Sequence, residues 1–231
     1  TFDENSGRAY VYIVPVVSVE ETEAYAREFF ARFDAGIDES RTDIYDETAI
    51  YYNDDNSLSL WIDYEGNKIN YTNFTSHYDE EGAGPKTNAT EEEIRLAAEE
   101  LGFFLPKEAD YINEENGNYR FECNCIVVDD YVYDGNSIVR YNENNLICDL
   151  DYNIIKCSPY KEFPIISEEE AYNLISEGKY RFEPAFEPSI IIINDIYLSY
   201  EVDSKGFYQP IYIFECNVDG EDTRMYTPAI P

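Results

Sequence analysis

The chain has 231 residues, of which 49 are acidic and 16 basic, and its formal net charge is -33. Because this charge repels phosphate groups, we expect neither a nucleic-acid partner nor attraction to an anionic membrane surface. With 44% hydrophobic residues the chain can bury a substantial core. It has no apolar run near the roughly 18 residues of a membrane-spanning helix, so no transmembrane segment is predicted.

Three segments carry the same signals for an α-helix. Each begins with a hydroxyl residue that can cap the helix, has Glu three residues later, and ends near a Gly. This spacing predicts a capping box, in which the hydroxyl and the Glu each bind a backbone N–H group at the helix start. The predicted helices cover residues 18–34, 90–102 and 167–178.

The segments between the helices alternate apolar and polar residues, as β-strands with one buried face do. Short turns separate most of them, which favours antiparallel pairing over parallel sheets, because parallel strands need long crossover connections. We therefore predict an α+β fold of repeated units, each a capped helix packed on mainly antiparallel sheet. The expected strands cover residues 46–52, 58–64, 68–74, 118–128, 137–141, 145–150, 154–157, 190–202, 207–218 and 224–229.

The tetrapeptide Phe-Glu-Cys-Asn occurs twice, at residues 121–124 and 214–217. Each copy ends a Tyr-rich, strand-like run, and other short matches recur at nearly the same offset. We interpret the recurrence as one α+β unit used at least twice, with an N-terminal unit over 1–132 and a C-terminal unit over 133–231. The recurring residues are of structural types and include no catalytic set.

Five cysteines raise the question of a disulfide. If Tyr152 and Asn153 form a two-residue hairpin turn, Cys148 and Cys157 stand opposite each other and are a candidate pair. The alternative is that all five cysteines are small buried thiols. The CxC spacing at 123–125 favours neither a zinc site nor thioredoxin chemistry.

The sequence contains no GxSxG, GxGxxG or P-loop motif. His77, the sole histidine, lies in a polar stretch without a hydrolase motif beside it. Acidic residues are so frequent that no carboxylate pair stands out for glycosidase chemistry. The Asx-rich runs at 53–56 and 129–136 are explained by turns, with weak calcium binding as the alternative. We therefore predict no enzyme activity, no cofactor and no dedicated metal site.

Tyrosines cluster near the C-terminus around a Gln-Pro pair. Tyrosine combines contact area with a polar tip, and a proline in a strand removes one ladder donor, so it marks an edge or a strand start. These features predict an exposed edge where a partner protein docks, the alternative being ordinary half-exposed strands. The candidate partner-binding residues are Tyr197, Tyr200, Tyr208, Gln209, Pro210 and Tyr212.

The C-terminal half also carries a longer pattern. Its parts are a Ser-capped helix at 167–178, Ile-Tyr-Leu-Ser-Tyr-Glu at 196–201, Tyr-Gln-Pro-Ile-Tyr-Ile-Phe at 208–214 and Thr-Pro-Ala-Ile at 227–230. In this order they resemble the YycI/YycH-type extracytoplasmic proteins of Gram-positive bacteria and, more loosely, PepSY-like modules. The resemblance extends over residues 165–231 and partly over 45–160. It implies an envelope protein that modulates a sensor kinase by contact and catalyses nothing.

The chain begins at Thr1, so we expect an upstream segment, which a removed signal or lipoprotein leader would explain. With 23 tyrosines and one methionine, the composition suits an exported protein. We predict a non-enzymatic protein, secreted or lipid-anchored at the cell surface, that binds a protein or cell-wall partner such as a sensor-kinase ectodomain. Two alternatives are a secreted hydrolase acting on glycans through paired carboxylates, and a PepSY-like inhibitory module.

Overall fold

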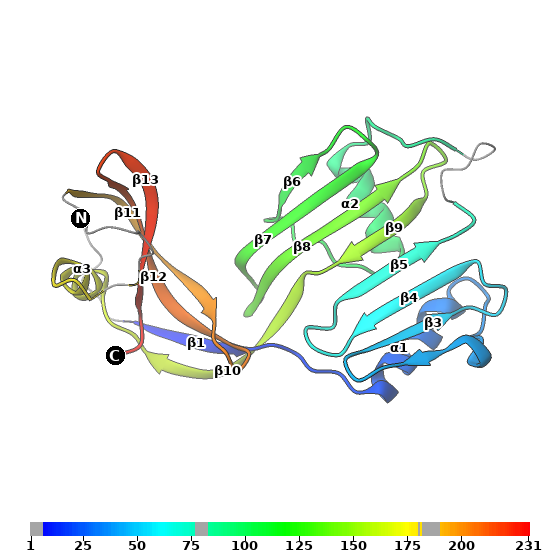
Figure 1. Cartoon of the computed structure of the whole chain (residues 1–231), viewed down its shortest axis with the longest axis horizontal. Helices are drawn as coiled ribbons and strands as arrows, with labels where there is room; N and C mark the ends of the chain where they lie inside the picture. The colour runs from blue at the N-terminus through cyan, green and yellow to red at the C-terminus, as the bar shows by residue number, and fades with distance from the viewer. Residues whose placement is uncertain (1–6, 77–82, 180, 182–189) are drawn as a thin grey trace. The chain divides into compact units, whose positions relative to one another are not determined.

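The computed structural model of the chain describes residues 7–76, 83–179, 181 and 190–231 (Figure 1). Antiparallel strands dominate it, with 50% of the residues in strands and 15% in helices. The expected α+β class with repeated helix-on-sheet units is therefore wrong, and the fold is mainly antiparallel β. The reason is that the strands extend well beyond several expected ranges, whereas the three described helices have only 13, 10 and 9 residues.

The chain forms two compact units. Unit 1 combines the two ends of the chain, Thr1–Ile13 and Ser158–Pro231, and unit 2 is the continuous stretch Val14–Cys157. The boundary expected between residues 132 and 133 falls inside a strand of unit 2, β8 (Tyr131–Tyr141). Among the described helices none is both long and apolar enough to span a bilayer.

Unit 2 is an antiparallel sheet in the strand order β2-β3-β4-β5-β9-β8-β7-β6. Its helical elements are α1 (Val19–Ala31), the short 3₁₀ helix η1 (Glu39–Arg41) and α2 (Glu91–Glu100). Its other strands are β2 (Asp43–Ile44), β3 (Thr48–Tyr52), β4 (Leu58–Asp63), β5 (Ile69–Asn73), β6 (Asp110–Asn113), β7 (Asn118–Val128) and β9 (Ile147–Tyr152).

The next strand, β10 (Ile155–Pro164), belongs to unit 2 only at its start, where residues 155–157 pair with β8. The strands β9 and β10 therefore lie one after the other along the same side of β8, because β7 occupies the other side. Gly135 of β8 lies where the chain passes from β9 to β10. A Cβ atom at this position would approach the backbone oxygen of Asn153 to 2.2 Å, so the passage requires glycine.

The core of unit 2 lies between its sheet and its two α-helices. Both helices begin with the predicted capping box, with Ser18 at α1 and Thr90 at α2. Phe29 of α1 is buried and lies 5.4 Å from the ring of Tyr71 and 6.0 Å from that of Phe103, measured between centroids. Side chains alternate along the strands, so that one face of the sheet enters this core and the other lies away from the helices.

Unit 1 contains, among its described residues, one α-helix and the remaining strands. These elements are β1 (Arg8–Ile13), the rest of β10, α3 (Glu168–Ser176), β11 (Ile191–Val202), β12 (Phe207–Val218) and β13 (Glu221–Pro228). The helix α3 has its predicted capping box at Ser167, and it buries Ala171 and Ile175 in a core with Phe214 and Met225.

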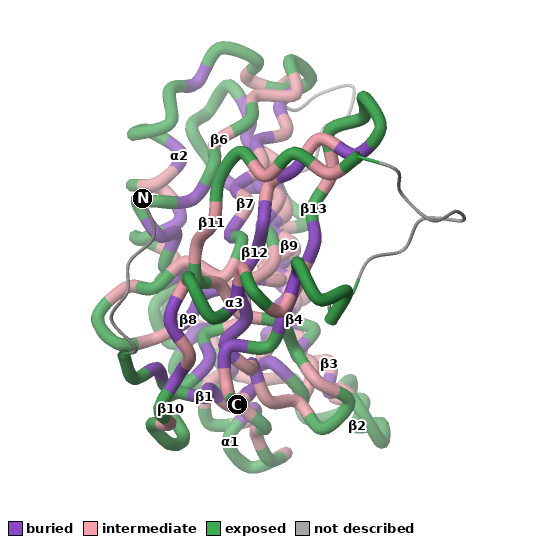
Figure 2. The backbone as a smooth tube through the Cα atoms, turned by 90° about the vertical axis from the view of Figure 1, so that its left-hand side faces the viewer, coloured by how far each residue is buried: buried purple, intermediate pink, exposed green. Residues whose placement is uncertain are grey.

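The strand β12 is the centre of unit 1. It pairs with β11 along nearly its whole length on one side, and with β1 and then β13 on the other. Figure 2 shows buried residues along β12, whereas β11 is mainly exposed or half-buried. Pro210 lies between the residues that pair with β1 and those that pair with β13, and its carbonyl accepts the N–H of Ala229 at 3.0 Å. Pro210 lacks an N–H group, and it lies where the neighbour of β12 changes from β1 to β13, so no hydrogen bond within either strand pair is lost.

Candidate functional site

The described residues contain no group of three or more His, Cys, Asp and Glu side chains that could hold a metal ion. His77 lies outside the described residues. The Asx run at 53–56 forms a turn in which the Oδ1 of Asn53 accepts the N–H of Leu58 at 2.9 Å. In the run at 129–136, Asp129 and Asp130 have positive φ angles in the turn between β7 and β8. The first run thus serves as a turn, whereas the second does so only at Asp129 and Asp130, because residues 131–136 lie in β8.

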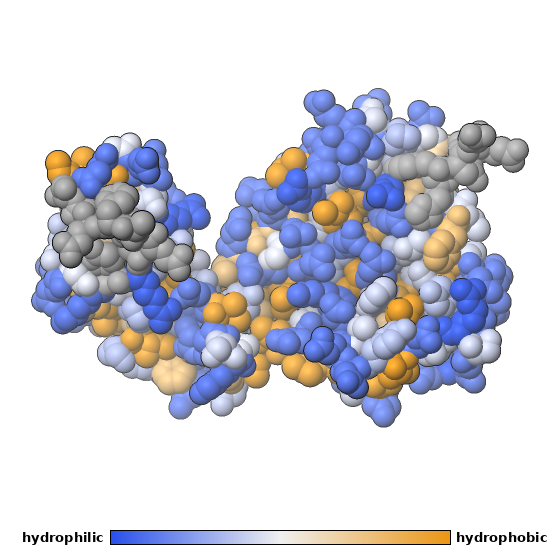
Figure 3. Space-filling view, viewed as in Figure 1, coloured by the Kyte–Doolittle hydropathy of each residue, from blue (hydrophilic) through white to orange (hydrophobic). Residues whose placement is uncertain are grey.

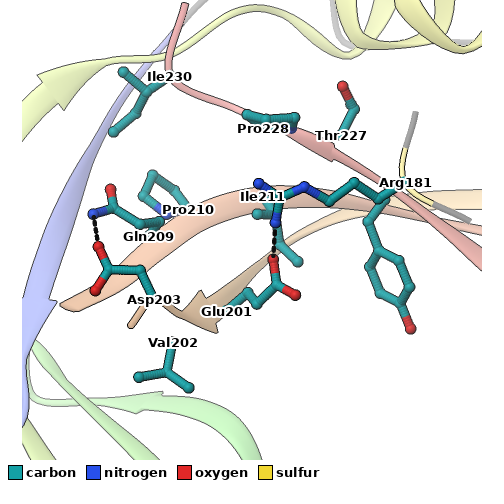
Figure 4. A pocket seen from close by; sticks show the side chains of 11 residues that line it. Arg181, Glu201, Val202, Asp203, Gln209, Pro210, Ile211, Thr227, Pro228 and Ile230 are labelled. Carbon is teal, nitrogen blue, oxygen red and sulfur yellow. Dashed lines mark hydrogen bonds and ion pairs between the residues drawn. The ribbon is translucent and has the colours of Figure 1, made fainter. Parts of the chain in front are cut away.

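Unit 1 has a pocket of about 170 Å³ where the ends of β11, β12 and β13 meet (Figure 4). Apolar side chains form much of its wall: Val202, Pro210, Ile211, Pro228 and Ile230. For comparison, an engineered apolar cavity of about 150 Å³ binds benzene. The pocket therefore has room for about one apolar side chain of a ligand.

Two polar pairs also line this pocket, and Figure 4 marks each by a dashed line. A guanidinium N–H of Arg181 donates to a Glu201 carboxylate oxygen at 3.1 Å, and both side chains are well exposed. Backbone hydrogen bonds exchanged with Tyr226 hold Arg181 against β13. The Nε2 of Gln209 donates to Oδ2 of Asp203 at 3.1 Å. The apolar wall is thus combined with a cation, carboxylates and an amide in fixed positions.

Asp203 is an ionised group held by the turn between β11 and β12. Its Oδ1 accepts the backbone N–H groups of Phe207 at 3.0 Å and Lys205 at 2.8 Å. The hydrogen bond from Phe207, followed by that from Lys205, lowers the pKa of Asp203 below its usual value of 3.8. The pocket therefore keeps a fixed negative charge at neutral pH.

The strand β11 borders this pocket, and its outer side is open in the described part of the chain, where β11 pairs with β12 alone. It is 12 residues long. Ile192, Leu198 and Val202 are exposed along it. On the face drawn in Figure 3, the surface is largely hydrophilic and apolar residues are scattered over it. A long strand with several exposed apolar side chains is the kind of edge that another strand can join.

The predicted partner-binding residues divide between this surface and the core. Gln209 and Pro210 line the pocket, and Tyr197 and Tyr200 are half-buried on β11. Two others are core residues of β12. Tyr208 is 3% exposed, and Tyr212 is 5% exposed with its hydroxyl donating to the Ile166 carbonyl at 2.8 Å. The six residues thus do not form one exposed cluster.

Sequence reasoning missed the pocket residues Arg181, Glu201, Asp203 and Ile230. They come from three separate segments. Glu201 and Ile230 end two segments of the C-terminal pattern, and Asp203 begins the turn predicted between two strands, but none of these signals marks a binding residue. The Tyr-rich pattern lies on two strands that border the pocket, but it could not tell which side of each strand faces the core.

None of the five cysteines forms a disulfide in the structure, Cys148 and Cys157 included. The hairpin expected to bring these two together does not form, because β9 and β10 follow each other along β8. Burial raises the pKa of Cys148 to about 11 and that of Cys157 to about 12. Thiols with such pKa values carry little thiolate at neutral pH and are poor nucleophiles.

The similarity of the chain to known proteins is low. No protein-family model matches the chain, and no curated protein matches it. A search of solved structures finds the Bacillus megaterium YpeB C-terminal domain, with 9% sequence identity, a TM-score of 0.32 and 94% of each chain covered. A likeness this low carries no conclusion about function, so the resemblance to YycI/YycH-type proteins stays a prediction.

Proposed function

We propose that the chain is a non-enzymatic binding protein that takes up an extended segment of a partner protein along β11 in unit 1. The observation that carries this proposal is that the open, 12-residue edge of β11 ends beside the pocket of about 170 Å³. An edge and an adjoining pocket together provide two kinds of contact, one with the partner's backbone and one with a side chain.

The edge supplies affinity through main-chain hydrogen bonds. Alternate N–H and C=O groups of β11 point away from β12, and an added strand pairs with them as the next strand of the sheet. Because β11 has a bulge between Ile193 and Asp195, the exposed side chains of Ile192 and Leu198 lie on opposite faces of the sheet, and each contacts a different face of that segment. The pocket receives one apolar side chain at the end of the segment, which fixes its register.

The charge of the chain favours a basic segment. Asp195 and Glu201 lie on β11, and Asp203 lies in the pocket. A second copy of this chain also carries a net charge of -33, so its approach is opposed by repulsion. A segment that contains Lys or Arg gains from the same field and associates faster.

The expected location and partner class follow from the sequence. We propose that the protein acts outside the cytoplasm, secreted or lipid-anchored at the cell surface. The resemblance to YycI/YycH-type proteins implies a sensor-kinase ectodomain as the partner, contacted and regulated without catalysis. The sensor-kinase partner is a more specific proposal than strand addition at β11. The partner can prove to be another protein while strand addition at β11 remains correct.

Site-specific photo-crosslinking tests the docking mode. Benzoylphenylalanine placed at Ile192 should crosslink, in envelope extracts, to a partner peptide that mass spectrometry maps to an extended basic segment. Adding Leu198→Lys should abolish the crosslink, because a lysine on an edge strand opposes pairing and repels a basic partner. Ile112→Lys is the matched control, since Ile112 and Leu198 are each 38% exposed and Ile112 lies on the edge strand β6 of unit 2.

The control variant should keep the crosslink. A crosslink that both lysine variants weaken equally would show that added charge, and not the β11 edge, matters. A crosslink to a second copy of the chain, or none that Leu198→Lys removes, would also contradict the proposal.

A further inference from the structure

The face of the unit 2 sheet that lies away from the helices carries the chain's single tryptophan. Trp61 stands on β4 between the buried residues Leu60 and Ile62, so the alternation of the strand directs it to the opposite face. Its side chain is 46% exposed. A large indole ring left in solvent gives up the stabilisation of burial, and such rings are enriched where ligands bind.

A broad hollow of about 470 Å³ lies beside Trp61, entirely within unit 2. Its lining residues are Trp61, Asp63, Lys68, Ile69, Asn70 and Asn153. They come from three places in the sheet: the hairpin of β4 and β5, the turn between those strands, and the passage after β9. One aromatic ring and a few convergent polar groups are typical of a small-ligand site.

The polar groups of this hollow are of both hydrogen-bonding kinds. The carboxylate of Asp63 accepts, the ammonium of Lys68 donates, and the amide of Asn153 does both. Within the described part of the chain, these three side chains have no hydrogen-bond or ion-pair partner. They are therefore available to a ligand without breaking a contact of the protein.

Asn70 is held in place by its neighbours. It lies directly opposite Trp61 in the pairing of β4 with β5, and its Nδ2 donates to a carboxylate oxygen of Asp151. The hydroxyl of Thr72 donates to the Oδ1 of Asn70 at 3.4 Å. The amide beside the indole ring therefore has a fixed orientation, which lowers the entropy cost of binding.

We infer that this hollow is a binding site for an uncharged saccharide, with one sugar ring lying against Trp61. A sugar ring has a C–H face that packs on an aromatic ring, and its hydroxyl groups both donate and accept hydrogen bonds. Asp63, Lys68 and Asn153 meet those hydroxyl groups. Ile69 also lines the hollow, but its side chain is buried in the core on the other face of the sheet, so Trp61 supplies the apolar contact. The site is separate from the β11 edge, which lies in the other unit.

The charges around the hollow favour an uncharged ligand over a polyanion or a cation. Asp63 and Lys68 give the lining one negative and one positive charge, in a chain whose net charge is -33. A polyanion is repelled by the chain as a whole, and the ammonium of Lys68 opposes a cation placed over the indole ring. A neutral, hydroxyl-rich ligand meets neither obstacle.

The single tryptophan makes the test direct. The full chain is titrated with cellotetraose, chitotetraose and maltotetraose up to about 10 mM, a range that covers weak saccharide sites with millimolar Kd. At least one probe should change the Trp61 emission in a saturable way. Because the ligand is uncharged, its Kd should hardly change between low and high salt.

Variants then locate the contact by calorimetry. Trp61→Ala should weaken binding at least about tenfold, and Lys68→Gln by a smaller factor. Tyr45→Ala is the matched control, since Tyr45 is an exposed aromatic residue of unit 2 outside the hollow, and it should bind as the parent chain does. Circular dichroism checks that each variant is folded.

Three results would overturn the inference. The first is that none of the probes gives a saturable change. The second is that Trp61→Ala binds as well as Tyr45→Ala. The third is that tetramethylammonium or a lysine-rich peptide binds at Trp61 in a salt-dependent way while the saccharides do not.

Discussion

Unit 2 ends its sheet in short strands, whereas unit 1 ends in a long one. The edge strands of unit 2, β2 and β6, have two and four residues, and each offers little backbone to a partner. In unit 1, β11 has 12 residues with several exposed apolar side chains. Proteins usually protect long edges of this kind. β11 has a bulge and two acidic residues but neither proline nor lysine, and no described strand pairs with its outer side, so this edge is where a further strand is expected to bind.

Another edge of unit 1 shows what protection looks like. Where β10 pairs with β1, it carries Pro159, Lys161, Glu162 and Pro164. Prolines remove ladder donors, and charged side chains oppose the approach of another strand. Both edges carry acidic residues, but only β10 has prolines and lysine, and this difference argues that the β11 edge has a role.

The two copies of Phe-Glu-Cys-Asn allow a residue-by-residue comparison of the units. In β7 and in β12 the Phe and the Cys are buried, while the Glu points away from the core. The recurrence thus reports the same inward and outward alternation on a central strand of each sheet. It reflects packing, and neither copy gathers a set of reactive groups.

The largest expected effect tests whether the two cores are independent. Phe29 belongs to the core of unit 2 and Phe214 to that of unit 1, and both are fully buried. Each change to Ala should cost about 3–5 kcal/mol of unfolding free energy, from lost burial and the cavity left behind. Trp61 fluorescence reports on unit 2 alone, whereas far-ultraviolet circular dichroism reports on both units.

Phe214→Ala should lower the temperature of an unfolding transition seen by circular dichroism and leave that of the Trp61 fluorescence transition unchanged. Phe29→Ala should shift the Trp61 transition. If Phe214→Ala moves the Trp61 transition by the same amount, the units unfold together and the comparison of separate cores fails.

The sequence predicted the helices well because their signals are local. A hydroxyl residue and a Glu three positions later satisfy two N–H groups within one turn, and all three capping boxes are present. Strand neighbours depend instead on residues far apart in the chain. The order of β9 and β10 along β8 required Gly135 to accept the close approach of Asn153, which no local pattern of the β9–β10 segment reveals.

The candidate sites were harder to predict for the same reason. The alternation in β12 shows that Tyr208 and Tyr212 share a face, but it does not say that this face is buried. Arg181 reaches the pocket through an isolated bridge to Tyr226, 45 residues further along the chain. Trp61 carries no local signal of its exposure, because an aromatic residue in an alternating strand can face either side of the sheet.

A smaller effect tests how far α3 supports unit 1. The hydroxyl of Ser167 accepts the N–H of Glu170 at 3.2 Å, and Ser167→Ala removes that cap. We expect a loss of about 1 kcal/mol, seen in the circular-dichroism transition of unit 1 and not in Trp61 fluorescence. Thr90→Ala removes the equivalent cap of α2 in unit 2, so it should lower the temperature of the Trp61 fluorescence transition instead. A Ser167→Ala variant as stable as the parent chain would mean that α3 is held by packing alone.

The smallest predicted effect is a pH dependence confined to the α2 cap. The Glu93 carboxylate accepts from the ammonium of Lys86 at 2.8 Å and from the Thr90 N–H at 2.7 Å. These bonds, that from Lys86 first, lower the pKa of Glu93 from 4.5 to about 2. Among the described residues, the Glu170 carboxylate in the α3 cap of unit 1 instead accepts hydrogen bonds from Ser167 only.

Because the folded pKa of Glu93 lies below the unfolded one, its contribution to stability is complete above about pH 4.5 and is lost as the pH falls toward 2. The parent chain should therefore lose thermal stability over this range more steeply than Glu93→Gln. Glu92→Gln is the control, since it removes an acid from the same helical turn and leaves the capping box intact. The measurement is the Trp61 melting temperature against pH, and parallel curves for Glu93→Gln and the parent chain would contradict the coupling between Lys86 and the α2 cap.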